Sequence, residues 1–271
     1  MSSKNLLIIA GDGPVGAQIS QLLRVAGLMI TLWLCTGCGA DDRQGGASGQ
    51  TEGRADVLLF SGTGTSPNDV KAFETLLKDQ HLKYSKVNSS ALNRMSEQQM
   101  RQFRLLIIPG GNFISIGNGL SPSATTNIHN AVENGLNYLG VCAGAFLAGH
   151  LPGTCLNLTG VKFGFYSATD RGIRKMPVPI VAPSGPALEQ YWEDGPQLTG
   201  WGSIVGKYPD GTPAIVQGTR GAGWVILCGV HPEAPASWRQ GMDFNTPVTA
   251  DTAFACTLIH AALNRDVLPH F

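Results

Sequence analysis

Short apolar runs alternate with amphipathic segments between residues 56 and 148, and this alternation predicts strands followed by helices. The apolar runs predict buried strands at 56–60, 82–87, 103–108 and 136–141. The amphipathic segments predict helices at 67–78, 96–101, 123–133 and 143–148. Ser66 before Pro67 favours a helix start, because serine caps the first turn and proline fits its first position. Such alternation predicts a mostly parallel sheet that is covered on both faces.

After about residue 153 the pattern changes to short apolar stretches separated by turn signals. Six short strands are predicted, at 161–168, 178–181, 188–192, 203–208, 214–217 and 224–228. A closing helix is predicted at 249–263. The predicted fold class is therefore α/β, with a mostly parallel central sheet and added short antiparallel strands in the C-terminal half.

The first fifty residues allow two interpretations, of which the first is a dinucleotide fingerprint. An apolar run at 6–10 precedes the glycine-rich turn Gly11–Gly16, and a helix at 15–25 and a strand at 28–33 could follow. This order places a pyrophosphate on a helix N-terminus. However, Leu34-Cys35-Thr36 stands where an acidic ribose-binding residue is expected, and no further strands follow before residue 50.

The second interpretation is a bacterial lipoprotein signal with a lipid anchor at Cys38. Arg24 precedes the apolar stretch 25–34, Thr36-Gly37 stands before Cys38, and a polar glycine-rich stretch follows. The 24-residue leader is longer than a normal charged region, which a translation start near Leu22 would explain. We favour this interpretation, with a location in the cell envelope, over an apolar helix of no special role in a cytoplasmic protein. The expected organisation is a leader at 1–38, a flexible linker at 39–54 and one domain at 55–271.

Composition and charge exclude several classes of protein. The 271 residues contain 19 basic and 19 acidic side chains, which removes the electrostatic basis for nucleic-acid binding. No uninterrupted apolar stretch reaches about 18 residues, so a protein with several membrane spans is excluded. Cys35 and Cys38 form one CxxC pair, but no second pair follows at zinc spacing, so no metal is expected.

Cys142 is the strongest candidate nucleophile. It stands in Gly140-Val141-Cys142-Ala143-Gly144, directly after a predicted strand and before a predicted helix. Small neighbours permit the sharp strand-to-helix turn of a nucleophile elbow, and a helix N-terminus lowers the pKa of a thiol. The alternative is a small buried core cysteine. The glycines on both sides and the preceding strand favour the elbow.

A base and its orienting carboxylate are predicted after the last short strand. His231 emerges there, and Glu233 follows two positions later, so both side chains can face one pocket. Pro232 fixes the backbone between them. A lone histidine at a strand end is more often a surface or core residue, but the preceding elbow favours a catalytic pair.

The turn Pro109-Gly110-Gly111-Asn112 ends the third predicted strand. Glycine pairs let backbone N–H groups approach a reacting centre, so Gly111 and Ala143 could form an oxyanion hole. Considered alone, this segment would be interpreted as an ordinary turn.

Residues 57–64, 109–111 and 138–145, together with His231-Pro232-Glu233, resemble the class I glutamine amidotransferase-like superfamily. Within it they resemble the branch named for the N-terminal domain of biotin-protein ligases, over residues 56–263. The resemblance implies a flavodoxin-like three-layer sandwich with Cys142 as nucleophile, His231 as general base and Glu233 as orienter. It also implies oxyanion donors at Gly111 and Ala143, and a substrate-binding rim formed by Gly62, Gly64, Gly110, Asn112 and Tyr191.

The predicted function is a thiol-dependent hydrolase or amidotransferase acting on an amide or peptide-like small molecule, without a cofactor. The sequence contains neither a synthetase domain to receive ammonia nor a biotin-ligase catalytic domain, so the substrate and any partner enzyme stay open. One alternative is a non-catalytic binding or scaffold protein with the same fold, anchored in the envelope. A further alternative is a nicotinamide-dependent oxidoreductase, which rests on Gly11–Gly16 alone.

Overall fold

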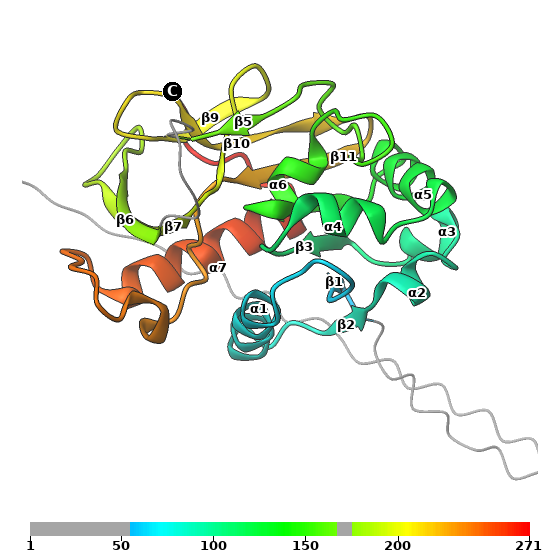
Figure 1. The fold of residues 1–271 in the computed structure, drawn as a ribbon, viewed down its shortest axis with the longest axis horizontal. Helices are drawn as coiled ribbons and strands as arrows, with labels where there is room; N and C mark the ends of the chain where they lie inside the picture. The colour runs from blue at the N-terminus through cyan, green and yellow to red at the C-terminus, as the bar shows by residue number, and fades with distance from the viewer. Residues whose placement is uncertain (1–54, 167–174) are drawn as a thin grey trace, which may run out of the picture. The chain divides into compact units, whose positions relative to one another are not determined.

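A computed structural model describes residues 55–166 and 175–271. The predicted leader, the linker, the Gly11–Gly16 motif and the lipidated Cys38 lie outside the described residues. Within them, seven strands form one sheet in the order β2-β1-β3-β4-β11-β10-β9 (Figure 1). The strands are β1 Val57–Phe60, β2 Tyr84–Val87, β3 Leu105–Ile108, β4 Asn137–Val141, β9 Ser203–Lys207, β10 Pro213–Arg220 and β11 Gly223–Cys228.

The first five strands in this order run parallel, and β10 and β9 continue the sheet antiparallel. The helices are α1 Pro67–Asp79, α2 Ser89–Leu92, α3 Glu97–Met100, α4 Phe113–Asn118, α5 Pro122–Glu133, α6 Ala143–Ala148 and α7 Val248–Asn264. The sheet carries helices on both faces, so the predicted α/β class with a mostly parallel sheet is confirmed.

Residue alternation in the central strands explains the three layers. Neighbouring residues of a strand point to opposite faces of the sheet. Val57 and Leu59 pack in one core cluster with side chains of α1 and α7. Leu58 and Phe60 pack in the other cluster with side chains of α5 and α6. A strand buried on both faces is apolar throughout, which is why these short runs were recognisable in the sequence.

Several helices begin directly after a residue that caps their first turn. The Ser66 side chain accepts a hydrogen bond from the N–H of Asp69, and Pro67 occupies the first turn of α1, as predicted. Ser96 and Gln99 form a reciprocal capping box at α3. Helices α2 and α4 were not predicted, because four to six residues give no clear helical periodicity. Their main sequence signal is an asparagine N-cap, Asn88 and Asn112 respectively.

The C-terminal half adds two small antiparallel pairs. Strand β6 Lys175–Ile180 pairs with β7 Leu188–Glu193, and β5 Gly164–Phe165 pairs with β8 Pro196–Gln197. Of the predicted strand at 161–168, residues 167 and 168 lie outside the described residues, and between 161 and 166 only the two residues of β5 form a strand. The backbone at Val161 bonds locally instead, because the Val161 carbonyl accepts from the N–H of His150 and its N–H donates to the Thr159 hydroxyl.

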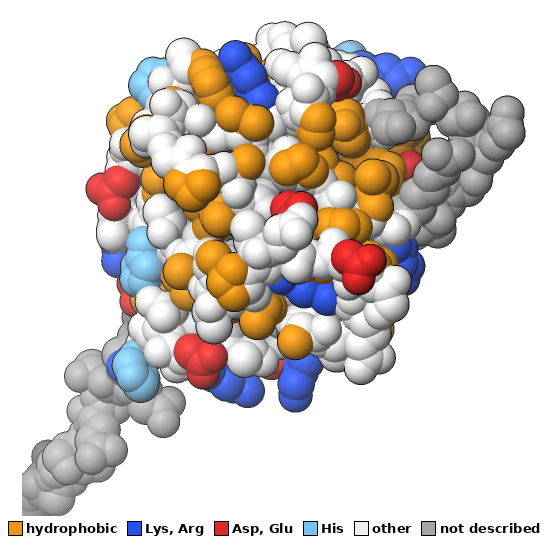
Figure 2. Space-filling view, turned by 90° about the vertical axis from the view of Figure 1, so that its left-hand side faces the viewer, with side chains coloured by type: hydrophobic (Ala, Val, Ile, Leu, Met, Phe, Trp, Pro, Cys, Tyr) orange, Lys and Arg blue, Asp and Glu red, His pale blue; other side chains and the backbone are white. Residues whose placement is uncertain are grey.

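Charged and hydrophobic side chains are mixed on the face of the molecule seen in Figure 2. Figure 2 shows hydrophobic side chains in small groups over one face, with charged side chains between them. No helix in the described part of the chain combines the length and the apolar character that a membrane span requires.

Candidate active site

The loops that follow β1, β3, β4 and β11 meet at one edge of the sheet. These strands are parallel neighbours, so their carboxyl ends lie together. The loop after β1 leads into α1, and the loop after β3 contains Gly110 and Gly111. Cys142 follows β4 directly, and His231 follows β11 by three residues. Chemistry-bearing residues from distant parts of the sequence therefore converge at this edge.

Cys142 occupies a strained turn between β4 and α6. Its backbone has φ 49° and ψ −104°, a conformation that L-residues rarely adopt. The Cys142 N–H donates to the Cys228 carbonyl at 2.8 Å, which ties the turn to β11. A Cβ atom on Gly144 would lie 1.9 Å from the Ile108 carbonyl oxygen, so no larger residue fits there. These are the features that a nucleophile elbow requires.

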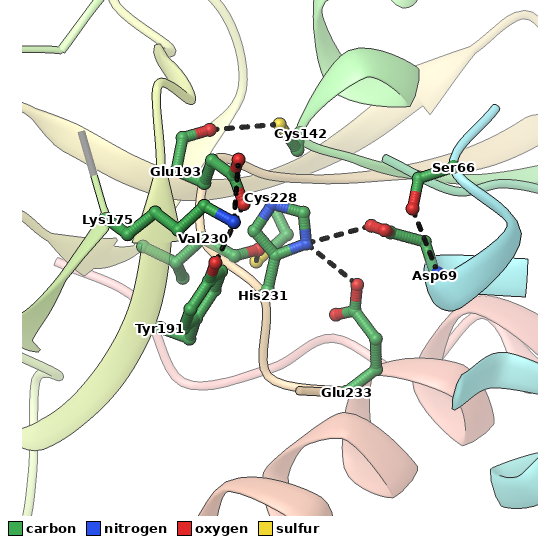
Figure 3. A network of polar contacts seen from close by, with 10 residues as sticks. All are labelled: Ser66, Asp69, Cys142, Lys175, Tyr191, Glu193, Cys228, Val230, His231 and Glu233. Carbon is green, nitrogen blue, oxygen red and sulfur yellow. Dashed lines mark hydrogen bonds and ion pairs between the residues drawn. The ribbon is translucent and has the colours of Figure 1, made fainter. Parts of the chain in front are cut away.

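His231 is buried, and one of its ring nitrogens faces two carboxylates. Nδ1 lies 2.9 Å from Oε1 of Glu233 and 3.1 Å from Oδ1 of Asp69 (Figure 3). The backbone N–H of His231 donates to the Tyr191 carbonyl at 2.8 Å, which joins the loop to β7. Because Nδ1 is engaged in this way, Nε2 is the nitrogen left for proton transfer.

His231, Asp69 and Glu233 change one another's pKa values. Burial disfavours the imidazolium of His231, but Cys142, Glu233 and Asp69 outweigh it and raise the pKa of His231 well above its ordinary value. Burial also opposes the charge of Asp69, yet hydrogen bonds and the attraction to His231 lower the pKa of its carboxyl. For Glu233 burial dominates and the pKa is raised. The site thus favours a protonated histidine.

Beside these groups lies a cavity of about 870 Å³. Its walls include Cys142, His231 and Asp69, and most of the remainder is aromatic or polar. On one side the rings of Phe113 and Phe146 stack at 4.8 Å, and Phe165 continues the row. On the other side Tyr191 and Trp238 meet at 5.4 Å, and Trp238 also meets the ring of His231 edge-on. The thiol is therefore flanked by two aromatic walls.

The predicted site residues fall into two groups. Those that line the cavity are Cys142, His231, Gly111, Asn112 and Tyr191. Glu233 lies behind His231, Gly110 lies against the Asp69–His231 pair, and Ala143 begins α6 beside the thiol. Within the described residues, the N–H groups of Gly111 and Ala143 donate to no protein acceptor. Gly62 and Gly64 belong to the loop after β1 and do not line the cavity.

Asp69 and Trp238 are the notable residues of this edge that the sequence analysis did not single out. Asp69 stands in the first turn of α1, and Trp238 lies in the short 3₁₀ helix η1 Ala236–Arg239. The position of Asp69 in the first turn of the helix that follows β1, at the carboxyl edge of the sheet, was a usable signal. The position of Trp238 depends on tertiary packing that no local pattern reveals.

Asp69, His231 and Glu233 also bring one potential metal-ligand atom each within 4.8 Å of one another. The two distances to Nδ1 are those of hydrogen bonds, so a proton on this nitrogen is sufficient to explain the arrangement. Hydrogen bonding is therefore sufficient to explain how these three side chains are placed.

Residues 55–154 match the protein family described as "Biotin-protein ligase, N terminal". The predicted resemblance is confirmed over these residues. The biotin-protein ligase N-terminal match includes Asp69, Gly110, Gly111 and Cys142, whereas His231 lies beyond it. A comparison with curated proteins returned no match.

Solved structures support the fold. A glutamine amidotransferase from Thermotoga maritima superposes with a TM-score of 0.51 at 11% identity, over 79% of this chain and 98% of its own. An exo-beta-1,4-mannosidase from Opitutaceae bacterium strain TAV5 gives 0.50 at 16% identity, over 77% of this chain. A beta-galactosidase from Bacillus circulans sp. alkalophilus gives 0.50 at 11% identity, over 80%. This chain spans 36% of that mannosidase and 32% of that galactosidase. At these identities the likeness concerns the fold alone, and it agrees with the flavodoxin-like sandwich.

Proposed function

We propose that this protein is a thiol-dependent hydrolase or amidotransferase that acts on a peptide-like amide. The observation that carries the proposal is that Cys142, on an elbow, and the buried His231 with Asp69 lie in the wall of one cavity, with Glu233 behind His231. A nucleophile, a base and an orienting carboxylate are the parts that covalent acyl transfer needs.

The reaction follows from these parts. The Cys142 thiolate attacks the carbonyl carbon, a carbon–sulfur bond forms, and the N–H groups of Gly111 and Ala143 receive the developing oxyanion. The carbon–nitrogen bond then breaks, and protonated His231 gives its proton to the leaving amine. Neutral His231 next takes a proton from water or an acceptor amine. That nucleophile attacks the thioester, the acyl group leaves, and the thiolate and the imidazolium are restored.

The cavity supports a substrate larger than a free amino acid amide. Its volume of about 870 Å³ lies within the range of small-molecule sites, which enclose drug-sized ligands. Aromatic rings on both sides of the thiol favour apolar or aromatic groups next to the scissile amide. A small acyl group such as that of glutamine would leave most of this surface unoccupied.

Alkylation of the full chain with iodoacetamide between pH 5 and 9, followed by peptide mapping, tests the proposal. Among the cysteines of the described residues we expect Cys142 to react fastest, because burial raises the pKa of Cys155 to about 11 and raises those of Cys228 and Cys256. At pH 6, His231→Ala should slow Cys142 labelling roughly tenfold or more, because the variant removes the cationic neighbour that stabilises the thiolate.

His270→Ala is the matched control, because His270 is exposed near the C-terminus and does not line the cavity. It should leave the labelling rate unchanged. Equal labelling of Cys142 in the wild type and in His231→Ala would contradict the proposal and would favour a non-catalytic binding protein.

A further inference from the structure

We propose that Asp69, at the start of α1, is the ionised carboxylate that positions His231, and that Glu233 is its neutral hydrogen-bonding partner. This inference rests on the proposed function, because it assigns the orienting role within the same site. It also departs from the sequence pattern, in which Glu233 alone was expected to orient the histidine.

The first argument is that one N–H faces two acids. Oε1 of Glu233 and Oδ1 of Asp69 both lie at hydrogen-bond distance from Nδ1 of His231. All three atoms are within 4.8 Å of one another, and the side chains of Asp69 and Glu233 are 7% and 0% exposed. Two carboxylates this close in a buried site resist ionising together, so their pKa values separate and one acid keeps its proton. The remaining question is which of the two is charged.

Local partners favour a charge on Asp69. Asp69 stands in the first turn of the 13-residue helix α1, where the partial positive charge of the helix stabilises an anion. Burial raises the pKa of the Asp69 carboxyl, but hydrogen bonding and the attraction to His231 outweigh burial and lower it. Figure 3 shows Asp69 reaching the imidazole from α1, with Ser66 behind it.

Glu233 lacks comparable support. Its side chain is fully buried, and it does not stand at the N-terminus of an α-helix as Asp69 does. One oxygen of each acid, Oε2 of Glu233 and Oδ1 of Asp69, makes no hydrogen bond within the described residues, so the difference between the two acids lies in their helix environment. Its raised pKa points in the same direction.

The fold makes room for Asp69 at this position. A Cβ atom on Gly110 would lie 2.1 Å from Oδ1 of Asp69 and 2.7 Å from Cε1 of His231. The loop after β3 therefore passes so close to the pair that only glycine fits. This close approach explains why glycine stands at position 110. The oxyanion-hole interpretation of the segment did not explain it.

The other titratable groups around His231 come from neighbouring strands and turns. Cys142 comes from the β4–α6 turn, and Cys228 ends β11. From β7, the Tyr191 hydroxyl donates to Glu193 at 2.7 Å, and Glu193 also pairs with Lys175 of β6 at 3.4 Å. Glu193 therefore has its own partners, and Asp69 and Glu233 are the two acids at Nδ1.

The decisive experiment compares Asp69→Asn with Glu233→Gln, which remove one acid each without changing its shape. The readout is the pH profile of Cys142 alkylation in the full chain. Loss of the Asp69 charge should destabilise the imidazolium and move the profile to higher pH, lowering the rate at pH 6 by roughly tenfold for a shift of about one unit. Glu233→Gln should move the profile less and should lower the rate at pH 6 by roughly threefold or under.

Asp79→Asn, at the other end of α1, is the matched control and should leave the profile in place. A larger shift in Glu233→Gln than in Asp69→Asn, or equal shifts, would overturn the assignment. A purely structural role for Asp69 would lower stability without moving the pH profile.

A second measurement needs no variant. Carboxyl carbon NMR of the wild-type protein should give Asp69 a titration below the ordinary range and Glu233 a titration above it. The reverse order overturns the inference. Because this experiment does not require a reactive thiol, failure of the proposed function and failure of this inference remain distinguishable.

Discussion

The two sides of the cavity are built differently. The parallel strands β3 and β4 are fully buried, and they carry the glycine loop and Cys142 at their ends. The opposite side comes from the β6–β7 pair and η1, which lie outside the main sheet (Figure 1). The bond from the His231 N–H to the Tyr191 carbonyl joins this outer part to the site, and Val178, Ile180 and Trp192 pack in the core cluster that contains side chains of α1 and α7.

This contrast separates reaction chemistry from recognition. A site on buried strands holds its geometry because the surrounding core fixes each backbone atom. Peripheral segments tolerate change, so they are where cavity walls can be remodelled for different substrates. Under the proposed function, the reaction chemistry lies on the parallel edge, and the added elements supply much of the substrate selectivity. The match to the biotin-protein ligase N-terminal family covers β1, β3 and β4 of the parallel edge, whereas β11 and His231 lie beyond it.

The largest expected effect comes from Gly144→Ala on the parallel edge. The new Cβ atom would meet the Ile108 carbonyl oxygen at 1.9 Å, and neither α6 nor β3 has space to retreat. Strain of this kind in a core should lower the free energy of unfolding by about 3 kcal/mol or more. Thermal or urea unfolding of the purified protein measures it.

Gly164→Ala in the short strand β5 provides the comparison. Its Cβ atom would meet only the Gln197 side chain, at 3.6 Å. We expect a change within about 0.5 kcal/mol, as for a surface substitution. Similar losses in both variants would remove the distinction between a rigid edge and a tolerant periphery.

The next largest effect concerns the attachment of η1. Arg239 donates to Asp251 of α7 and to the Thr246 carbonyl, and both charged side chains are nearly buried. Arg239→Met should leave the Asp251 charge unpaired and lower the free energy of unfolding by about 3 kcal/mol. Urea unfolding measures the loss.

Arg101→Met is the matched control on the other side of the molecule. Arg101 and Glu97 form an exposed pair within α3, so the change should stay within about 0.5 kcal/mol. Equal effects would mean that Arg239 does not hold η1 in place, and that the aromatic wall depends on other contacts.

The difference between the two sides of the cavity also explains which features could be predicted from the sequence. Strands such as Leu105–Ile108 are apolar throughout because both their faces are buried, and Cys142 stands between glycines because the elbow admits nothing larger. Local physics therefore determines these features, and it is visible in the residue pattern. The position of His231 and Glu233 after the last short strand predicted the base for Cys142, and the resemblance then supplied the flavodoxin-like arrangement.

The rest depends on contacts between distant segments. Asp69 lies 162 positions before His231. In the sequence it looks like an ordinary acidic residue in the first turn of a helix, close to the N-cap. Trp238 belongs to a single 3₁₀ turn, and Gly164 and Phe165 pair with a strand some thirty residues later. None of these relations leaves a periodic signal. The sequence therefore predicted the framework and the nucleophile more fully than the cavity walls.

The smallest of the expected effects separates recognition from reactivity directly. Trp238→Ala removes the ring that meets both Tyr191 and His231 at the outer wall. Alkylation of Cys142 by a phenylalanyl chloromethyl ketone should become roughly tenfold less efficient, equal to about 1.4 kcal/mol, because a buried aromatic contact is lost. The loss should appear as weaker saturation by the probe, while the rate with iodoacetamide changes little because that reagent does not fill the cavity. Phe271→Ala, an exposed aromatic at the C-terminus, controls for general loss of aromatic surface. If Trp238→Ala slowed both reagents equally, Trp238 would act by positioning His231, and the outer elements would belong to the reaction chemistry as much as the parallel edge does.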